Sequence, residues 1–305
     1  MEDLKQKLEA ILTSERSFVK EMEPMSRHTT FRIGGPAALY AAPGNEAELA
    51  ALLRLCRERD VPVRILGNGS NLLVSDRGLS GVVVAMEENW NYGGPEGENS
   101  LRAGAGLLLS KAASLALSHS LTGLEFAAGI PGTVGGAVMM NAGAYGSEMK
   151  NVVTSVRVMD REGEIHVLDN EQMEFGYRTS CVARLDYVVL ETVMALAPGD
   201  AGEIRARMDD LAARRREKQP LEYPSAGSTF KRPAGYFAGK LIQDSGLRGV
   251  SRGGAQVSEK HCGFVINRGG ATAADVLELC SHVQATVKEN FGVDLEMEVR
   301  RWGEF

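Results

Sequence analysis

The sequence predicts an α+β protein with more than one domain. Its 305 residues exceed what a single hydrophobic core usually serves, so two or three domains are expected. A helix and short strands fill the first part, a mostly β region with one helix follows, and a further mixed region ends the chain. We therefore predict domains at 1–85, 86–200 and 201–305.

The first domain is predicted to be a small α/β unit. Asn45 with Glu48 three residues later is typical of a helix N-terminus, and apolar residues then recur at helical spacing to about Asp60. Short strands are predicted next, at 62–66, 72–74 and 82–84. The first two are joined by the polar glycine turn at 67–71, which reads GNGSN.

The second and third domains show longer β segments and further helices. Asp160-Arg161-Glu162-Gly163 lies between two alternating segments and indicates a β-hairpin. Helices are predicted at 107–119, 203–218 and 237–244, and from Thr272, with Asp275, onward. Strands are predicted near Leu101 and at 152–158, 164–168, 187–196, 263–267 and 294–302.

The stretch from Phe126 to Ser147 carries no charge and six glycines. Its length would suit a membrane span, but Pro131, Asn141 and scattered glycines are poor material for a continuous helix in lipid. Glycine packs no side chain and loses the most entropy on folding, so core formation does not explain the run. Backbone N–H groups converging on a phosphate, or main chain lying against a planar ring, would explain it.

The turn at 67–71 begins like a dinucleotide fingerprint. Leu72 stands where the third glycine is needed and no helix opens there, so a Rossmann NAD site is not expected. An ordinary tight turn is one alternative. The other is a turn whose amide N–H groups, with Asn and Ser side chains, surround a pyrophosphate, and the second glycine-rich stretch favours it.

Two patterns imitate serine nucleophile sites. The segment 249–253 fits G-x-S-x-G, but no strand-to-helix elbow is predicted around Ser251. Ser147 with Lys150 and Ser228 with Lys231 fit S-x-x-K, but S-D-N and K-T-G motifs are missing. A serine hydrolase is therefore not expected.

Composition argues against several kinds of partner. A formal net charge of −6 disfavours nucleic acid, and the one basic cluster, at 214–218, is interpreted as a solvated helix end. The 4 cysteines show neither C-x-x-C pairs nor metal-ligand spacing, so neither disulfides nor a metal site are expected. The N-terminal residues lack a secretory pattern, which predicts a cytoplasmic protein.

Seven segments, in order along nearly the whole chain, resemble the UDP-N-acetylenolpyruvoylglucosamine reductase (MurB) family. They are HTTFRIGGPA (28–37), GNGSNLLVSDRGLSGVVV (67–84), GLEFAAGIPGTVGGAVMMNAGAYGSEM (123–149), FGYRTS (175–180), AGSTFKRP (226–233), GGAQVSEKHCGFVIN (253–267) and EVR (298–300). The resemblance implies a flavoenzyme of peptidoglycan precursor synthesis, with consequences for cell-wall biogenesis, cell shape and cell division. Too few residues separate Arg178 from the helix at Glu203 for the substrate-covering loop of longer members, which is typical of the shorter subclass.

The resemblance also implies a fold and a cofactor. The fold would be a two-subdomain FAD-binding fold of the vanillyl-alcohol-oxidase (PCMH) type at 1–85 and 86–200, followed by an α+β substrate-binding domain at 201–305. FAD would be tightly bound and NADPH would be the co-substrate. The residues implied to hold FAD are Gly67, Asn68, Gly69, Ser70, Asn71, Pro131, Gly132, Thr133, Gly135, Gly136, Ala142, Gly143 and Tyr145.

Three polar residues gain catalytic roles from the resemblance, although each also allows an ordinary interpretation as a surface ion-pair member or a turn hydroxyl. Arg178 would stabilise the enolate that forms on the substrate carboxylate, and Glu298 would stand near that carboxylate. Ser228 would donate a proton to a substrate carbon. The residues implied to contact the phosphates or sugar of a UDP-sugar substrate are Tyr177, Lys231, Arg232 and Lys240.

Two alternatives to this function stay open. One is another flavin oxidoreductase of the same fold, and the segments AGSTFK and EVR argue against it. The other is a catalytically silent nucleotide-binding module, and intact Arg178, Ser228 and Glu298 argue against that. We expect no nucleic-acid or membrane partner, and a monomer or weak oligomer.

Overall fold

The computed structural model describes residues 2–305, which group by contacts into two units. Unit 1 comprises the residues up to Glu21, Leu39–Asn68 and Gly81–Arg215, and unit 2 comprises Met22–Ala38, Gly69–Ser80 and Arg216–Phe305. The boundary between them falls inside the 67–71 turn. The predicted division at 85 and 200 follows the sequence rather than contacts and stays a prediction.

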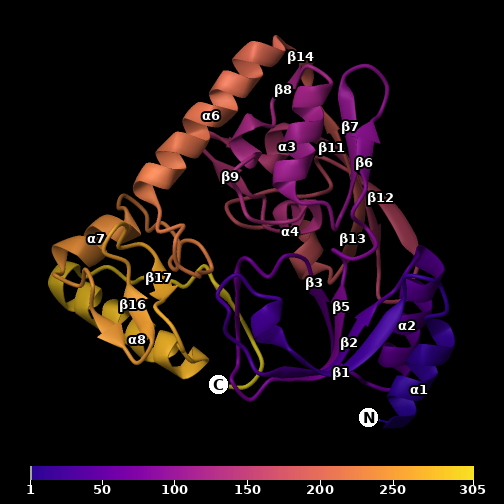
Figure 1. Cartoon of the computed structure of the whole chain (residues 1–305), viewed down its shortest axis with the longest axis horizontal. Helices are drawn as coiled ribbons and strands as arrows, with labels where there is room; N and C mark the ends of the chain where they lie inside the picture. Colours follow the sequence, from indigo (N-terminus) through magenta and orange to yellow (C-terminus); the bar gives the residue numbers. More distant parts are fainter. Residues whose placement is uncertain (1) are drawn as a thin grey trace. The chain divides into compact units, whose positions relative to one another are not determined.

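A five-stranded antiparallel sheet forms the centre of unit 1, in the order β12-β11-β13-β7-β6, with α3 and α4 packed against it (Figure 1). Its strands are β6 Gly93–Pro95, β7 Ser100–Gly104, β11 Val153–Met159, β12 Ile165–Asp169 and β13 Val188–Ala195. The hairpin prediction is confirmed, because β11 pairs with β12 and the Asp160 carboxylate accepts from the N–H groups of Glu162 and Glu164 at 3.0 and 2.9 Å. Gly163 closes this turn with a φ of 82°.

A second sheet has the order β1-β2-β5-β3, in which β3 and β5 are parallel. Its strands are β1 Phe18–Pro24, β2 Pro36–Ala42, β3 Val63–Leu66 and β5 Leu79–Ala85. The strands predicted at 62–66 and 82–84 are therefore confirmed. The first two strands were not predicted, because β1 carries three charges and β2 is rich in alanine, both poor strand signals.

Within the described residues, unit 1 contains six α-helices, of which the sequence predicted α2, α3 and α6. They are α1 Glu2–Ile11, α2 Glu46–Glu58, α3 Leu109–Ser118, α4 Val134–Met139, α5 Cys181–Arg184 and α6 Ala201–Lys218, whose last turn passes the end of unit 1. The N-cap prediction for α2 is confirmed, since the Asn45 side chain accepts from the Glu48 N–H at 3.0 Å. Short paired strands complete this unit: β8 Leu121–Thr122 with β14 Ala197–Pro198, and β9 Gly143–Ala144 with β10 Ser147–Glu148.

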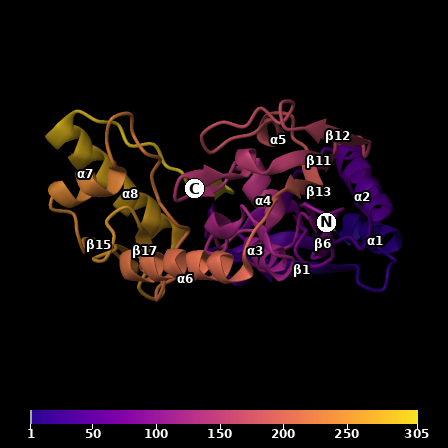
Figure 2. The same ribbon diagram turned by 90° about the horizontal axis from the view of Figure 1, so that it is seen from above.

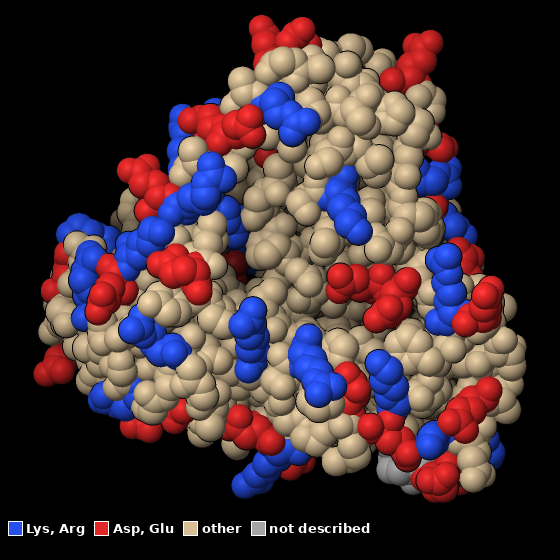
Figure 3. Space-filling view, viewed as in Figure 1, with Lys and Arg blue, Asp and Glu red and all other residues tan. Residues whose placement is uncertain are grey.

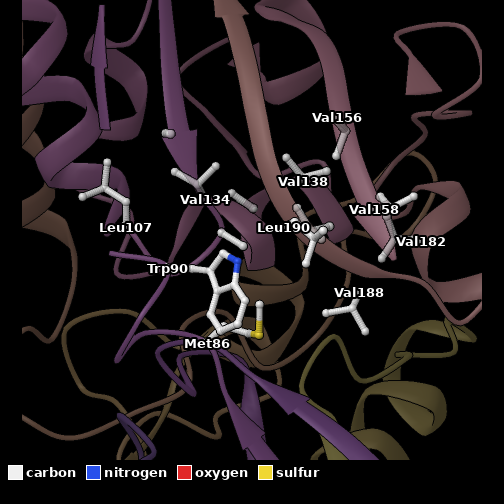
Figure 4. Packing of buried hydrophobic residues seen from close by; sticks show 14 of the residues in the cluster. Met86, Trp90, Leu107, Val134, Val138, Val156, Val158, Val182, Val188 and Leu190 are labelled. Atoms are coloured by element: carbon white, nitrogen blue, oxygen red, sulfur yellow. The ribbon is translucent and has the colours of Figure 1, made fainter. Parts of the chain in front are cut away.

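The core of unit 1 lies between its helices and its strands. Figure 4 shows Trp90 beside Met86, with Val134 from α4 and Leu190 from β13 nearby. All four side chains are at most 4% exposed. Val134, Ala137 and Val138 of α4 belong to this core, which is close-packed with valine and leucine from the strands. The core therefore fixes the position of α4, which lies in the middle of the uncharged stretch.

The uncharged stretch is not one helix. It begins inside the 3₁₀ turn Glu125–Ala127, continues through α4 and ends inside the β9–β10 hairpin. Throughout residues 2–305 the structure contains no helix with the length and apolarity needed to cross a bilayer.

Unit 2 packs α8 against the small sheet β15-β16-β17 and α7 against α8 (Figures 1 and 2). Its elements are the 3₁₀ turn Met25–Arg27, β4 Leu72–Val74, α7 Ala238–Asp244, β15 Ser251–Arg252, β16 Ala255–Val257, β17 Val265–Asn267, α8 Ala273–Phe291 and β18 Arg300–Trp302. As predicted, α8 begins at a Thr272–Asp275 capping box. The Asp76 carboxylate also accepts from the N–H groups of Ala273 and Ala274, which anchors this helix to the loop after β4.

The last predicted strand is shorter than expected. Only Arg300–Trp302 forms a strand, parallel to β4, whereas the residues before it make a single bridge between Phe230 and Met297. The prediction of one strand over 294–302 is therefore wrong, because the chain changes pairing partner after Glu298.

Candidate functional site

The turn and the uncharged stretch meet in unit 1. The Asn68 side-chain amide donates to the Pro131 carbonyl at 2.6 Å. A Cβ atom at position 67 would lie 2.4 Å from Thr133 Oγ1, so only glycine fits there. Two segments that lie far apart in sequence therefore form one backbone surface.

Backbone N–H groups on these segments are left for a ligand. In unit 1, those of Asn68, Gly132 and Thr133 have no protein acceptor among residues 2–305. In unit 2, the same holds within the described chain for Ser70 and Asn71. Amide donors suit phosphate oxygens, so Asn68, Gly132 and Thr133 of unit 1 fit the pyrophosphate of a dinucleotide such as FAD.

Some glycines of the uncharged stretch are required by packing within the protein, and one leaves its backbone open to a ligand. Added Cβ atoms would lie 2.8 Å from the Ala105 side chain at Gly135 and 2.8 Å from the Glu148 side chain at Gly143. These two glycines are required by packing within the protein. At Gly136 the nearest atom would be Thr133 Oγ1 at 3.6 Å, which leaves this exposed glycine free to lie close to a ligand.

Arg215 corrects the interpretation of the basic cluster. Its neighbours Arg214 and Arg216 are exposed, but Arg215 is half-buried, and a Cβ atom at Gly129 would lie 3.1 Å from its Cδ. Burial lowers the pKa of its guanidinium. Arg215 is therefore a cation packed against the uncharged stretch. Its burial follows from helical spacing, because Arg215 continues the buried stripe of Ile204, Met208 and Leu211 on α6.

Ala142 and Tyr145 lie where the stretch turns back on itself. The Ala142 N–H donates to the Ala137 carbonyl at 2.8 Å, which ends α4. Tyr145 is exposed, has a φ of 54° and donates its hydroxyl to the Leu211 carbonyl at 3.3 Å. The hydroxyl thus ties the hairpin to α6.

Arg178 lies at the tip of a tight turn in unit 1. The Gly176 N–H donates to the Thr179 carbonyl at 3.0 Å, and the Thr179 N–H donates back at 3.3 Å. Arg178 has a φ of 56°, at the third position of the turn, where glycine or asparagine is usual. Its guanidinium lies 5.2 Å from the ring centre of Tyr177, which is exposed. A residue with a long side chain and a strained backbone at a turn tip indicates a functional constraint.

Ser228 and Glu298 come together in unit 2. The Glu298 N–H donates at 2.9 Å to the carbonyl of Thr229, which is the residue after Ser228. The Lys231 N–H donates to the Glu296 carbonyl at 2.8 Å, so two short extended segments run antiparallel. Ser228 is exposed and Glu298 is half-buried. Sequence spacing alone could not bring these two residues together.

Thr229 and Asn71 hold this pair from behind. Thr229 is 1% exposed, and its hydroxyl accepts from the Val265 N–H at 2.9 Å. The Asn71 side-chain amide donates to the Glu298 backbone carbonyl at 3.2 Å, and the Asn71 backbone carbonyl accepts from the Arg300 N–H. One residue of the predicted cofactor turn therefore also holds the backbone of a predicted catalytic residue.

The predicted substrate cations lie on the surface of unit 2. Lys231 pairs with Glu296 and Lys240 with Asp244. Arg232 stacks 4.0 Å from the ring centre of Phe237, which is 62% exposed. Figure 3 shows basic side chains gathered along α6, whereas basic and acidic side chains are interspersed over the rest of the drawn face.

Other chemistry finds no support in the described chain. Ser251 lies in β15, which turns into β16, so the segment around it has no strand-to-helix elbow. No three His, Cys, Asp or Glu side chains among residues 2–305 gather as metal ligands. All four cysteines are free and buried, and burial raises the pKa of Cys280 to about 12.

Two family models match the chain. An FAD-binding domain model matches residues 37–169, and the model of the UDP-N-acetylenolpyruvoylglucosamine reductase C-terminal domain matches residues 219–302. The first match covers the turn and the uncharged stretch, and the second covers Ser228 and Glu298.

Curated relatives match over nearly the full length. A UDP-N-acetylenolpyruvoylglucosamine reductase from Clostridium perfringens is 57% identical over 91% of this chain and 90% of that protein. One from Caldanaerobacter subterraneus subsp. tengcongensis is 52% identical over 99% of both chains.

Solved structures confirm the predicted fold. The crystal structure of the reductase from Thermus caldophilus matches with a TM-score of 0.81 and 36% identity, over 94% of this chain and 100% of that one. A Phl p 4 variant described as a glucose oxidase shares the fold alone, with a TM-score of 0.51 and 14% identity over 65% of this chain and 44% of that one. The chain therefore belongs to the UDP-N-acetylenolpyruvoylglucosamine reductase family.

Proposed function

We propose that this chain reduces the enolpyruvyl group of UDP-N-acetylglucosamine enolpyruvate to give UDP-N-acetylmuramate, with NADPH as reductant. One hydride equivalent from NADPH and one proton add across the carbon–carbon double bond, and NADP⁺ is released. The observation that carries the proposal is the near-full-length identity to reductases of this name, at 57% over 91% of the chain. The product belongs to peptidoglycan precursor synthesis, so the enzyme would serve cell-wall biogenesis, cell shape and division.

FAD is the redox group of this reaction, and, when bound, it passes the reducing equivalents of NADPH to the substrate. The amide donors of Asn68, Ser70, Asn71, Gly132 and Thr133 would hold its pyrophosphate. The open backbone at Gly136, together with Pro131 and the turn glycines 67 and 69, would let the cofactor approach main chain. The remaining contacts would come from Gly135, Ala142, Gly143 and Tyr145.

Arg178 would bind the carboxylate of the enolpyruvyl group. Addition at one vinyl carbon builds negative charge on that carboxylate, and a fixed guanidinium stabilises it without reorganising. The strained turn supports this role, because a backbone that has already adopted a left-handed conformation holds the side chain ready. Tyr177 would contact the substrate beside it.

Ser228 would donate the proton to the other vinyl carbon. A hydroxyl is a weak acid, so a neighbouring group or water would resupply it. Glu298, whose backbone is bonded next to Ser228, would orient the substrate carboxylate or take part in this resupply. Lys231, Arg232 and Lys240 would contact the phosphates or the sugar.

The domain roles follow from these assignments. We propose FAD-binding subdomains at 1–85 and 86–200 and a substrate-binding domain at 201–305, in a cytoplasmic protein of the shorter subclass that acts as a monomer or weak oligomer. NADPH and the UDP-sugar would be its partners, without nucleic acid or membrane.

The test is an anaerobic titration of the purified yellow protein. NADPH should bleach the flavin absorbance, and UDP-N-acetylglucosamine enolpyruvate should restore it. Bleaching without restoration would overturn the substrate assignment. A colourless protein that retains no flavin absorbance after incubation with FAD and removal of free FAD would favour the silent nucleotide-binding module.

A further inference from the structure

We propose that Asn141 is a positioning residue that holds Arg178 in place by tying its turn to the FAD-binding stretch. The inference rests on the proposed role of Arg178 and concerns unit 1 alone. Asn141 directly follows the end of α4 and is 1% exposed. It was not among the site residues that the sequence predicted.

The nitrogen and the oxygen of the Asn141 side-chain amide each form a hydrogen bond. Its Nδ2 donates to the Gly176 carbonyl at 3.0 Å, and its Oδ1 accepts from the Lys150 N–H at 2.9 Å. The first bond reaches the first residue of the Arg178 turn, and the second reaches the segment after the β9–β10 hairpin. A buried side chain that satisfies a donor and an acceptor of two different segments fixes the distance between them.

A second bond ties the other side of the same turn. The hydroxyl of Ser180, which is 3% exposed, donates to the Met139 carbonyl at 3.0 Å. Residues at both ends of the 176–180 segment are therefore bonded to the C-terminal end of α4. Since α4 is packed in the core of unit 1, the turn inherits its position from that core.

The turn needs such ties because of its strain. Arg178 has a φ of 56°, a conformation that costs a non-glycine residue about 1–2 kcal/mol. Without external bonds the turn would relax to a conformation that suits arginine better, and the guanidinium would move. Asn141 itself has a φ of 41°, which asparagine tolerates better than most residues. Few other side chains could combine this backbone with an amide donor and acceptor.

The experiment uses the FAD-loaded enzyme and the variant Asn141→Asp. Aspartate keeps the acceptor for the Lys150 N–H but loses the donor to the Gly176 carbonyl. Flavin content and reduction by NADPH should stay near the wild-type values, while reoxidation by the enolpyruvyl substrate should slow about 10–100-fold, the scale expected for a misplaced catalytic group. Asn141→Gly, which is neutral and tolerates the positive φ, should show the same division between half-reactions.

The matched control is Asn170→Asp. The Asn170 amide also bridges two backbone carbonyls of unit 1, those of Lys150 and Val153, at 2.9 and 2.7 Å. It does not bond to the Arg178 turn. This variant should keep both half-reactions within about threefold of wild type.

Two readouts separate positioning from general damage. Amide hydrogen exchange of the peptide spanning 174–183 should accelerate about tenfold or more in Asn141→Asp, and not in Asn170→Asp. In the Arg178→Ala background, Asn141→Asp should slow reoxidation by no more than about twofold, because its effect is transmitted through the arginine.

Three outcomes would overturn the proposal: equal slowing of both half-reactions, additive effects in the double variant, or loss of FAD from both Asn141 variants. If wild type is never reoxidised by the substrate, the proposed function itself fails. If Arg178→Ala reoxidises normally, the role of Arg178 fails. These results are distinct from a failure of Asn141 alone.

Discussion

Unit 1 presents its proposed catalytic residue on a strained turn, whereas unit 2 presents its pair on two segments joined by antiparallel backbone hydrogen bonds. Arg178 has a left-handed φ, and two hydrogen bonds hold the segment that carries it: the Asn141 amide donates to the Gly176 carbonyl, and the Ser180 hydroxyl donates to the Met139 carbonyl. Ser228 and Glu298 are held by backbone pairing between neighbouring segments, supported by the buried Thr229.

The difference teaches where each site is vulnerable. Paired backbone distributes its support over several bonds, so losing one side chain leaves the geometry largely in place. A strained turn depends on a few specific bonds, and its strain lowers stability while fixing the guanidinium. Substitutions in unit 1 should therefore separate stability from activity more sharply than those in unit 2.

The largest effect should come from Arg178. Arg178→Ala and Arg178→Gly should both slow flavin reoxidation about 10³-fold, as expected for a lost charge-stabilising group. The glycine variant should be about 1 kcal/mol more stable to urea than the alanine variant, because glycine accepts the positive φ. Stopped-flow absorbance and urea unfolding measure the two quantities. Equal stability of the two variants would show that the turn is not strained.

Ser228→Ala should have the next largest effect, slowing reoxidation about 10²-fold. The residue is exposed, so stability should change by less than about 0.5 kcal/mol. Reduction by NADPH serves as the internal control in the same stopped-flow experiment. A matching loss in both half-reactions would argue against the role of proton donor.

Thr229→Val tests the support behind the unit 2 pair. Valine keeps the shape but leaves the Val265 N–H without its acceptor, which should cost about 2 kcal/mol of unfolding free energy. Because the backbone bonds to Glu296 and Glu298 remain, reoxidation should slow less than about tenfold. A larger loss of rate than Asn141→Asp would invert the comparison between the units.

Glu48→Gln tests stability of unit 1 away from the site. Burial raises the pKa of Glu48, but hydrogen bonds from the hydroxyls of Ser14 and Ser17 and from the N–H groups of Gly44 and Ser14 outweigh it and lower the pKa to about 2. A lowered folded-state pKa stabilises the protein above the ordinary value of 4.5, and this contribution disappears as the pH falls toward 2.

The glutamine variant should therefore be about 1 kcal/mol less stable at pH 7, with the difference shrinking between pH 4.5 and pH 2. Urea unfolding across this pH range measures it. Both half-reactions at pH 7 should match wild type. Slower reoxidation would mean that loss of stability in unit 1 alone disturbs the Arg178 turn.

Local signals in the sequence predicted about half of the helices and strands. The Asn45 cap, the Thr272–Asp275 box and the Asp160 hairpin each depend on residues close in sequence, and each is confirmed. The strand predicted over 294–302 is wrong because pairing partners, not local pattern, decide where it begins. Arg215 was misjudged because charge was weighed without following the buried stripe of its helix.

The sequence by itself determined the family and the cofactor class, because long segments such as the uncharged glycine stretch are specific without any coordinates. Only the tertiary structure showed that part of the glycines serve packing, that Asn71 bonds to Glu298, and that Asn141 bonds to the Arg178 turn. The physical reason is that such bonds join residues distant in sequence, and a buried amide's two partners are set by how the segments pack.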